Sequence, residues 1–195
     1  MAPERSALVL VDMQHDVVRG RWWTWWPEVG GIVTACVRLV DACHAQGVPV
    51  VYTKVEYRAD GSDTPGAIAS GVAEPTEYLV EGTPGTEIIP ELAPTAVDVV
   101  TTKNLVSAFT SKPFASRIAS LRADTLFVVG LAAEGGVRAT VQDAHDQGLH
   151  PIVVADACGA FGEASYREHM QERFPALGRV VDLPTALAML AAPPS

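Results

Sequence analysis

The chain has 195 residues, 48% of them hydrophobic and 19% charged, enough to bury a full core in what we expect to be one domain spanning residues 1–195. It carries 14 Lys and Arg against 23 Asp and Glu, a formal net charge of −9. Nucleic acids and anionic membranes bind clustered basic side chains, so this balance argues against both and favours a small-molecule or protein partner.

The N-terminal segment up to residue 18 predicts no export signal. Its apolar run is too short for the hydrophobic part of a signal peptide, and no A-x-A-like cleavage site follows it. Farther along, no run approaches the roughly 18 apolar residues that a membrane span requires. We therefore expect a cytoplasmic protein.

Six short apolar runs bounded by turn residues indicate β-strands. They cover residues 7–12, 48–55, 96–102, 125–130, 150–156 and 178–183. Helical patterns lie between most of them, including residues 29–47, which end at Gly47, and residues 136–148, which end at Gly148. Short Val/Ile/Leu strands that alternate with helices indicate a parallel sheet covered on both faces. The predicted fold is α/β, a Rossmann-like three-layer α/β/α arrangement around a central parallel six-stranded sheet.

The three cysteines do not form a recognisable framework. Cys36, Cys43 and Cys158 are odd in number and contain no C-x-x-C pair, so neither a disulfide scaffold nor a four-cysteine zinc site is expected. Cys36 and Cys43 lie on one face of the predicted helix and are interpreted as small buried residues. Cys158 follows the fifth predicted strand near the rim of the sheet, where catalysis is a minor alternative.

A long segment, residues 56–94, is rich in Gly, Pro and acidic residues and contains no clear strand. A connection of this length inside a compact domain is usually functional. We expect it to form a lid over the strand ends.

Two charged residues end predicted strands. Ligands of such sheets bind at the carboxyl ends of the strands, which places Asp12, Val55, Lys103 and the turn at 131–136 around one site. A charge at such a position is costly unless it is paired or functional. Asp12 and Lys103 therefore form either a structural ion pair or an acid/base with its electrostatic partner.

Three motifs resemble one known family. The stretches "ALVLVDMQHDVV", "KNLVSAF" and "VVGLAAEGGVRATVQDAHDQGLHPIVVADACGAF", in this order and spacing, are similar to the isochorismatase-like hydrolase superfamily, which includes cysteine amidases such as nicotinamidase and N-carbamoylsarcosine amidohydrolase. The resemblance runs from about Ser6 to about Leu190. It implies a homodimer or homotetramer. It also implies that Asp12 acts as general acid or base and that Lys103 supports it.

The nucleophile of this family does not carry over. In the amidases the turn after the fourth strand reads G-x-x-T-x-x-C-V-x-x-T, and the resemblance places Gly136 at the cysteine and Ala133 at the threonine. Glycine cannot form the thioester that divides amide hydrolysis into two easier steps. The metal-binding aspartate and histidines of the nicotinamidase branch also have no counterparts, so neither a metal nor another cofactor is expected.

The isochorismatase branch offers a partial precedent. Its members have glycine at the same position and use the aspartate as a general acid to protonate a vinyl ether. This chain departs from that branch at Val55, where isochorismatases have glutamine, and at Glu134, where they have histidine. We interpret the chain as an amidase-like form that has lost thiol chemistry.

Glu134 has two interpretations. As a carboxylate at a helix start, it is stabilised by the helix dipole and needs no further role. Alternatively it faces Asp12 as a second carboxylate, and burial separates the pKa values of the two groups. The dipole interpretation is the simpler one, and Glu134 is kept as a candidate catalytic residue beside Asp12 and Lys103.

Other candidate substrate contacts flank the first two strands. All four tryptophans lie in "RGRWWTWWPE", residues 19–28, and Trp22 and Trp23 are the closest of them to Asp12 along the chain. Arg58, beyond the second strand, is either a solvated surface residue or a ligand for a substrate carboxylate.

The leading hypothesis is a non-thiol enzyme for a small, partly apolar metabolite. Asp12 transfers a proton, Lys103 tunes it, and the backbone N–H groups of Gly135 and Gly136 stabilise developing negative charge or bind a carbonyl. The reaction would be a hydrolysis, ring opening or elimination without a covalent intermediate. The alternatives are an inactive homologue that serves as a binding or assembly protein, and an isochorismatase-type vinyl ether hydrolase.

Overall fold

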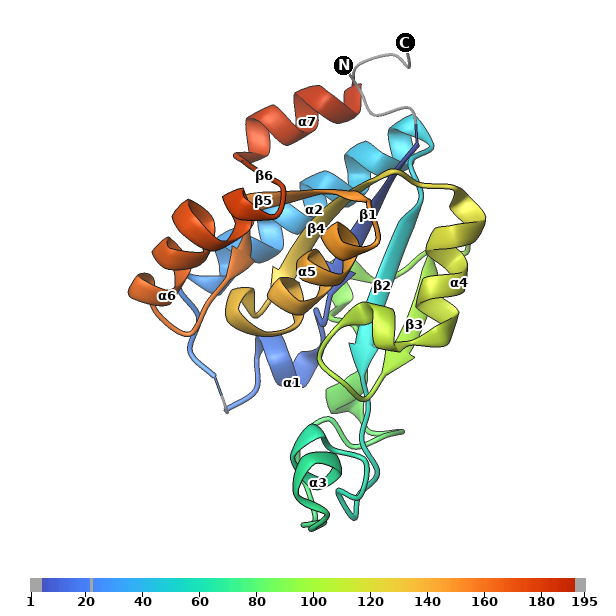
Figure 1. Ribbon diagram of the computed structural model, residues 1–195, viewed down its shortest axis with the longest axis vertical. Helices are drawn as coiled ribbons and strands as arrows, with labels where there is room; N and C mark the ends of the chain where they lie inside the picture. Colours follow the sequence, from blue (N-terminus) through green and yellow to red (C-terminus); the bar gives the residue numbers. More distant parts are fainter. Residues whose placement is uncertain (1–4, 22, 192–195) are drawn as a thin grey trace.

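The computed structural model describes residues 5–21 and 23–191. One sheet of six strands, all paired in parallel, forms its centre in the order β3-β2-β1-β4-β5-β6 (Figure 1). The strands are β1 (Ser6–Val11), β2 (Val50–Val55), β3 (Val99–Lys103), β4 (Thr125–Leu131), β5 (His150–Gly159) and β6 (Arg179–Val181). Each overlaps a predicted strand, so the α/β class and the parallel six-stranded sheet are confirmed.

Helices cover both faces of this sheet. They are the short α1 (His15–Val18) and α3 (Pro65–Ser70), then α2 (Val29–Gln46), α4 (Lys112–Leu121), α5 (Arg138–Asp146), α6 (Glu163–Glu168) and α7 (Leu183–Ala191). Figure 1 shows α4 and α5 in front of the sheet and α2 behind it, and α7 packs against α2. In the described part of the chain, every helix is too short or too polar to cross a membrane.

The boundaries of α2 follow from local sequence. The Glu28 side chain accepts a hydrogen bond from the Gly31 N–H at 3.4 Å and caps the first turn. Gly47 ends the helix in the left-handed region, at φ 66°, which glycine adopts at little cost. The buried face includes Cys36 and Cys43, as the sequence predicts.

The register of the central strands brings distant residues to one edge. Thr53 pairs with Val11 across β2 and β1, and Lys103 pairs with Val55 across β3 and β2. On the other side of β1, Val11 pairs with Gly130, directly before the turn that leads into α5. The connections from β1 and β4 leave toward opposite faces of the sheet, which opens a crevice beside the end of β1.

The long segment after β2 differs from the expected lid. It contains α3 and two 3₁₀ turns, Pro84–Thr86 and Pro90–Leu92, and α3 projects beyond the carboxyl ends of the strands, away from the sheet (Figure 1). Tyr57, Tyr78 and Leu79 are the residues of this segment that reach the site described below. The segment lies at the carboxyl ends of the strands, and these three residues form part of the wall of the site.

Candidate functional site

The site is built on a buried aspartate. Asp12 follows β1 with φ 56°, a left-handed conformation that aspartate tolerates better than most residues, and it is 6% exposed. The Lys103 Nζ donates to its Oδ2 at 2.7 Å, and the Thr53 Oγ1 donates to its Oδ1 at 2.8 Å. Lys103 is itself 5% exposed, so both charges are removed from water and compensate each other.

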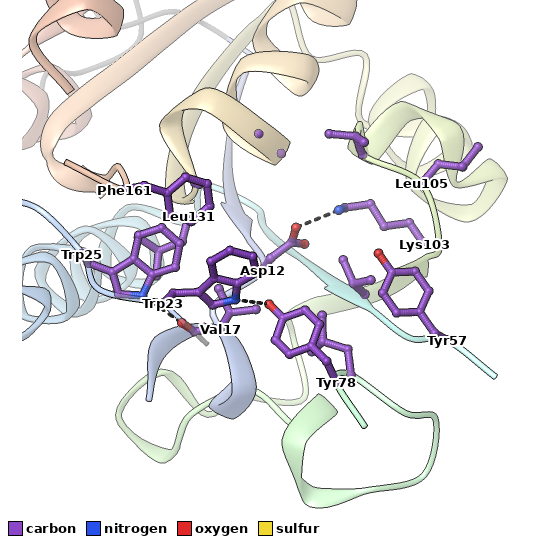
Figure 2. Close-up of a pocket in the computed structure, with 16 residues that line it drawn as sticks. Asp12, Val17, Trp23, Trp25, Tyr57, Tyr78, Lys103, Leu105, Leu131 and Phe161 are labelled. Carbon is purple, nitrogen blue, oxygen red and sulfur yellow. Dashed lines mark hydrogen bonds and ion pairs between the residues drawn. The ribbon is translucent and has the colours of Figure 1, made fainter. Parts of the chain in front are cut away.

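A cavity of about 230 Å³ opens over this pair (Figure 2). Its described lining is mostly aromatic and aliphatic: Asp12, Val17, Trp23, Trp25, Val55, Tyr57, Tyr78, Leu79, Lys103, Leu105, Val106, Leu131, Ala132, Gly135, Gly136 and Phe161. The volume lies below the roughly 300 Å³ at which pockets for drug-sized ligands begin. The cavity therefore suits a small molecule.

An aromatic wall forms one side of the cavity. We use this name for Trp23, Trp25 and Phe161; the Phe161 ring stacks on Trp23 at a centroid distance of 4.8 Å and on Trp25 at 5.1 Å. The Trp25 Nε1 donates to the Val17 carbonyl and the Trp23 Nε1 to the Tyr78 hydroxyl, each at 2.8 Å. These hydrogen bonds satisfy the polar edges of the indoles and leave the flat faces of the wall apolar.

Of the two tryptophans predicted as substrate contacts, Trp23 lines the cavity and Trp22 lies outside the described residues. Sequence reasoning missed Trp25 and Phe161. The two-residue spacing of Trp23 and Trp25 was a usable signal, because in an extended segment alternate residues share a side. Phe161 follows β5 and therefore lies at the same edge of the sheet as the other strand ends.

Two tyrosines also line the cavity, and one of them, Tyr78, contacts Trp23. Burial and, secondarily, the nearby charge of Asp12 raise the pKa of Tyr57 to about 12. Burial also raises the pKa of Tyr78 well above its ordinary value. Both hydroxyls are therefore neutral near pH 7.

The glycine turn after β4 lines the cavity next to Asp12. A Cβ at Gly136 would lie 2.9 Å from the Val11 Cγ1 and 3.0 Å from the Asp12 Oδ2. A side chain fits there only if one of these groups moves. The Gly135 N–H donates to the Ala132 carbonyl at 3.0 Å, so the expectation that this amide is available to a substrate is wrong.

Glu134 does not face Asp12. Its Oε1 accepts hydrogen bonds from the Phe161 N–H at 2.9 Å and the Ser165 Oγ at 2.8 Å, and the residue is absent from the cavity lining. Successive residues of a helical turn point in different directions, so the carboxylate and the Gly136 backbone lie on different sides of the turn at 133–137. The expectation of a second carboxylate facing Asp12 is corrected.

Of the two remaining predicted substrate contacts, Val55 lies at the cavity and Arg58 does not. Val55 lines the cavity, and the buried Gln14 side chain fixes its backbone by accepting from its N–H at 2.7 Å and donating to its carbonyl at 2.8 Å. Arg58 is exposed and lies outside the lining, because the chain turns from Arg58 to Gly61 away from the strand ends. The expected contact of Arg58 with a substrate carboxylate is therefore not supported.

All three cysteines are buried thiols, and none of them is among the described residues that line the cavity. Burial raises the pKa of Cys158 and of Cys43 to about 12, and it raises the pKa of Cys36 well above its ordinary value. A thiolate is the reactive form of cysteine, and burial disfavours it. In the described ranges, no group of three His, Cys, Asp or Glu side chains is placed to hold a metal ion.

We expect iodoacetamide at neutral pH to leave the native protein unmodified. Burial both blocks access and keeps the thiols protonated. Intact-protein mass spectrometry measures the result, and denatured protein is the control that shows alkylation at 3 cysteines per chain. Rapid modification of Cys158 in the native protein would contradict its burial.

The parallel α/β sheet thus carries a buried carboxylate–ammonium pair in a cavity at the carboxyl ends of its strands. Residues 6–185 match the family model described as isochorismatase domain. The chain belongs to the isochorismatase family.

Several relatives in this family are hydrolases of amides. The chain is 36% identical over 137 residues to N-carbamoylsarcosine amidase of Arthrobacter sp., a match that covers 68% of this chain and 51% of that protein. It thus spans about half the length of that relative. It is 32% identical over 177 residues to the phenazine biosynthesis protein PhzD1 of Pseudomonas aeruginosa, covering 86% and 77%.

Solved structures show the same fold. An N-carbamoylsarcosine amidase from Thermoplasma acidophilum superposes with a TM-score of 0.76 at 27% identity, covering 92% of this chain and 96% of that one. An isochorismatase family protein from Burkholderia thailandensis superposes with a TM-score of 0.84, covering 97% of each chain, and its 24% identity supports the fold alone.

Proposed function

We propose that this protein is a non-thiol hydrolase or lyase that acts on a small organic metabolite by proton transfer at Asp12. The observation that carries the proposal is the buried Asp12 carboxylate, 2.7 Å from the Lys103 ammonium at the floor of a small apolar cavity. An ionic pair of this kind is costly to bury and, by itself, poor evidence for a stabilising role. Its exposure to a cavity that admits a substrate favours a chemical role.

Asp12 would act as a general base. Thr53 and Lys103 each donate to one of its oxygens, an arrangement that matches an ionised carboxylate. Such a group accepts a proton from water as the water attacks, or from carbon or oxygen of the substrate in an elimination. Lys103 keeps its ammonium beside the transferring proton and holds the carboxylate in one orientation.

Gly136 supports a mechanism without a covalent intermediate. The family resemblance places the nucleophilic cysteine at this position, and a Cβ there would lie 2.9 Å from the Val11 Cγ1 and 3.0 Å from the Asp12 Oδ2, closer than a side chain tolerates. The described lining residues include no Cys, Ser, Thr or His side chain. Water is then the nucleophile in a hydrolysis.

Substitution of Gly136 with alanine tests whether the reaction needs the close approach of this glycine to Asp12. We expect the added methyl group to displace the Asp12 carboxylate, to cost about 1–3 kcal/mol of stability through overpacking, and to slow turnover by up to about 10²-fold through misplacement of the reacting groups. Chemical denaturation and steady-state kinetics measure the two effects. The matched control is Gly31→Ala in α2, where a Cβ meets nothing within 4 Å. Turnover by Gly136→Ala equal to that of the wild type would contradict this role.

The proposed reaction is tested by a substrate screen. Small uncharged amides, esters, lactams and enol ethers are incubated with the protein, and products are identified by mass spectrometry in ¹⁸O-labelled water, with Asp12→Asn as the comparison. Conversion that depends on Asp12 supports the proposal, and ¹⁸O in the product separates hydrolysis from elimination. Conversion by both proteins alike would overturn it. A purified wild-type protein that converts none of these compounds would support the inactive homologue.

The charge of the cavity argues against the isochorismatase-type alternative. Isochorismate carries two carboxylates, whereas Lys103 is the one cationic side chain of the described lining and is paired with Asp12. Arg58 lies outside the cavity lining. Incubation with isochorismate separates the two reactions.

The 32% identity to a phenazine biosynthesis protein is consistent with a role in specialised metabolism.

A further inference from the structure

We infer that the aromatic wall binds an uncharged, flat group of the substrate, and that Glu134 is a positioning residue that holds this wall against the catalytic edge of the sheet. The inference deepens the proposed function by naming the substrate class. It concerns binding, so it can fail independently of the chemistry at Asp12.

The preference for an uncharged group follows from the charges around the cavity. Asp12 and Lys103 are the charged residues of the described lining, and each is the other's partner. Tyr57 and Tyr78 are neutral near pH 7 because burial raises their pKa values. An anionic group would lose its hydration without gaining a free cation, and an unpaired buried charge is strongly disfavoured.

The preference for a flat group follows from the shape of the wall. In Figure 2 Trp23, Trp25 and Phe161 lie to one side of the Asp12 carboxylate, and Lys103, Leu105 and Tyr57 lie to the other. Trp23 and Phe161 are 40% and 48% exposed, a large apolar area for side chains that already stack on each other. A planar ring can cover this area by offset or edge-to-face stacking.

Glu134 ties the wall to the glycine turn. Its Oε1 accepts from the backbone N–H of Phe161, the wall residue that contacts both tryptophans, and from the Ser165 Oγ at the start of α6. The next two residues, Gly135 and Gly136, line the cavity beside Asp12. Backbone hydrogen bonds between Trp26 and Ala160 hold the tryptophan segment against the end of β5, and the Glu134 side chain then fixes Phe161 relative to the glycine turn.

Three probes of similar size test the substrate class. Benzamide is flat and uncharged, benzoate is flat and anionic, and cyclohexanecarboxamide keeps the amide but is not flat. We expect benzamide to bind more tightly than benzoate by at least about tenfold, since benzoate must bury an unpaired charge. Cyclohexanecarboxamide should bind about threefold to tenfold more weakly than benzamide, the factor that one aromatic stacking contact provides.

Titration calorimetry measures these dissociation constants. Equal or tighter binding of benzoate would overturn the uncharged class, and equal binding of cyclohexanecarboxamide would overturn the flat one. The Asp12→Asn variant distinguishes a failure of this inference about binding from a failure of the proposed reaction. It should lose turnover and keep the preference for benzamide over cyclohexanecarboxamide, which does not depend on charge, whereas benzoate should bind the variant more tightly than the wild type because Lys103 has lost its partner. In the wild type, turnover without the expected order of the three affinities would overturn the inference alone.

Two substitutions at Glu134 test its positioning role. Glu134→Gln keeps an oxygen that accepts both hydrogen bonds, and Glu134→Ala removes it. We expect the glutamine variant to bind benzamide and turn over substrate within about twofold of the wild type, because the retained acceptor leaves both hydrogen bonds in place. The alanine variant should weaken benzamide binding about threefold to tenfold and raise KM more than it lowers kcat.

A large fall in kcat for Glu134→Gln would show that the charge acts in the reaction and would overturn the positioning role. If Glu134→Ala does not fold, Phe161→Leu tests the role of the aromatic wall in its place. Phe161 is half exposed, so leucine should be tolerated there, and the variant should lose the preference for benzamide over cyclohexanecarboxamide. Retention of that preference would contradict the role of the wall.

Discussion

Replacement of Lys103 with methionine is expected to lower the free energy of unfolding by about 3–5 kcal/mol, the cost of leaving a buried partner charge uncompensated. Lys103 and Asp12 are 5% and 6% exposed and their charged atoms lie 2.7 Å apart. Methionine fills a similar volume but offers no donor to the Asp12 Oδ2. Urea denaturation measures this difference in the free energy of unfolding. The comparison holds when that free energy depends on urea concentration with the same slope in both proteins.

A double variant separates the missing charge from the missing packing. Asp12→Asn combined with Lys103→Met contains neither buried charge, so we expect it to regain much of the stability that Lys103→Met loses. Arg5→Met is the matched control, because Arg5 pairs with Asp124 on the surface, with side chains 57% and 37% exposed. The control should change stability by no more than about 1 kcal/mol. A double variant as unstable as Lys103→Met would contradict this account of the pair.

Asp12→Asn is expected to lower turnover by about 10²- to 10⁴-fold, the contribution of a positioned general acid or base. The asparagine carbonyl can still accept from Lys103 or Thr53, so the cavity keeps its shape and KM should change little. Its stability should also fall, because the Lys103 ammonium then lies buried without a counter-charge. Steady-state kinetics with a substrate from the screen measures both constants.

Asp124→Asn controls for loss of a carboxylate as such. Asp124 accepts from Arg5 at the surface and lies at the opposite end of the sheet, before β4. We expect its turnover to equal that of the wild type. Residual activity of Asp12→Asn above about a tenth of the wild-type value would show that proton transfer does not depend on this carboxylate.

The fold was predictable because each strand is a short apolar run bounded by turn residues, which can be recognised in the sequence alone. The inner strands β1, β2, β4 and β5 are largely buried, so the chain needs apolar stretches there whatever the details of packing, while the edge strands β3 and β6 are partly exposed and still contain short Val-rich runs. Asp12 and Lys103 were found by the same rule, since the ends of parallel strands meet at one edge. No knowledge of side-chain direction was required for either.

The errors concern residues whose direction depends on turn geometry. Glu134 lies in a turn of π-helical form at 133–137, so its side chain points to Phe161, although Gly136 lies beside Asp12. Arg58 is carried away by the turn that follows β2. Sequence spacing gives the neighbourhood of such residues but not their orientation.

Phe161 was missed because β5 is longer than predicted. In the pairing of β4 with β5, Val128 lies beside Val153 and Gly130 lies beside Cys158. β5 therefore contains extra residues at this irregularity in the register. The sequence prediction ended the strand at Asp156, a charged residue. The additional length carries Phe161 to the edge of the cavity and places it against Trp23.

The most direct test of the proposed chemistry is kcat measured side by side for Asp12→Asn and Cys158→Ser. Cys158 is buried, and serine can keep the contact of its Sγ with the Val128 carbonyl. The account predicts loss of turnover in the aspartate variant and wild-type turnover in the cysteine variant. The reverse pattern, an active Asp12→Asn and an inactive Cys158→Ser in folded proteins, would contradict it and indicate thiol catalysis.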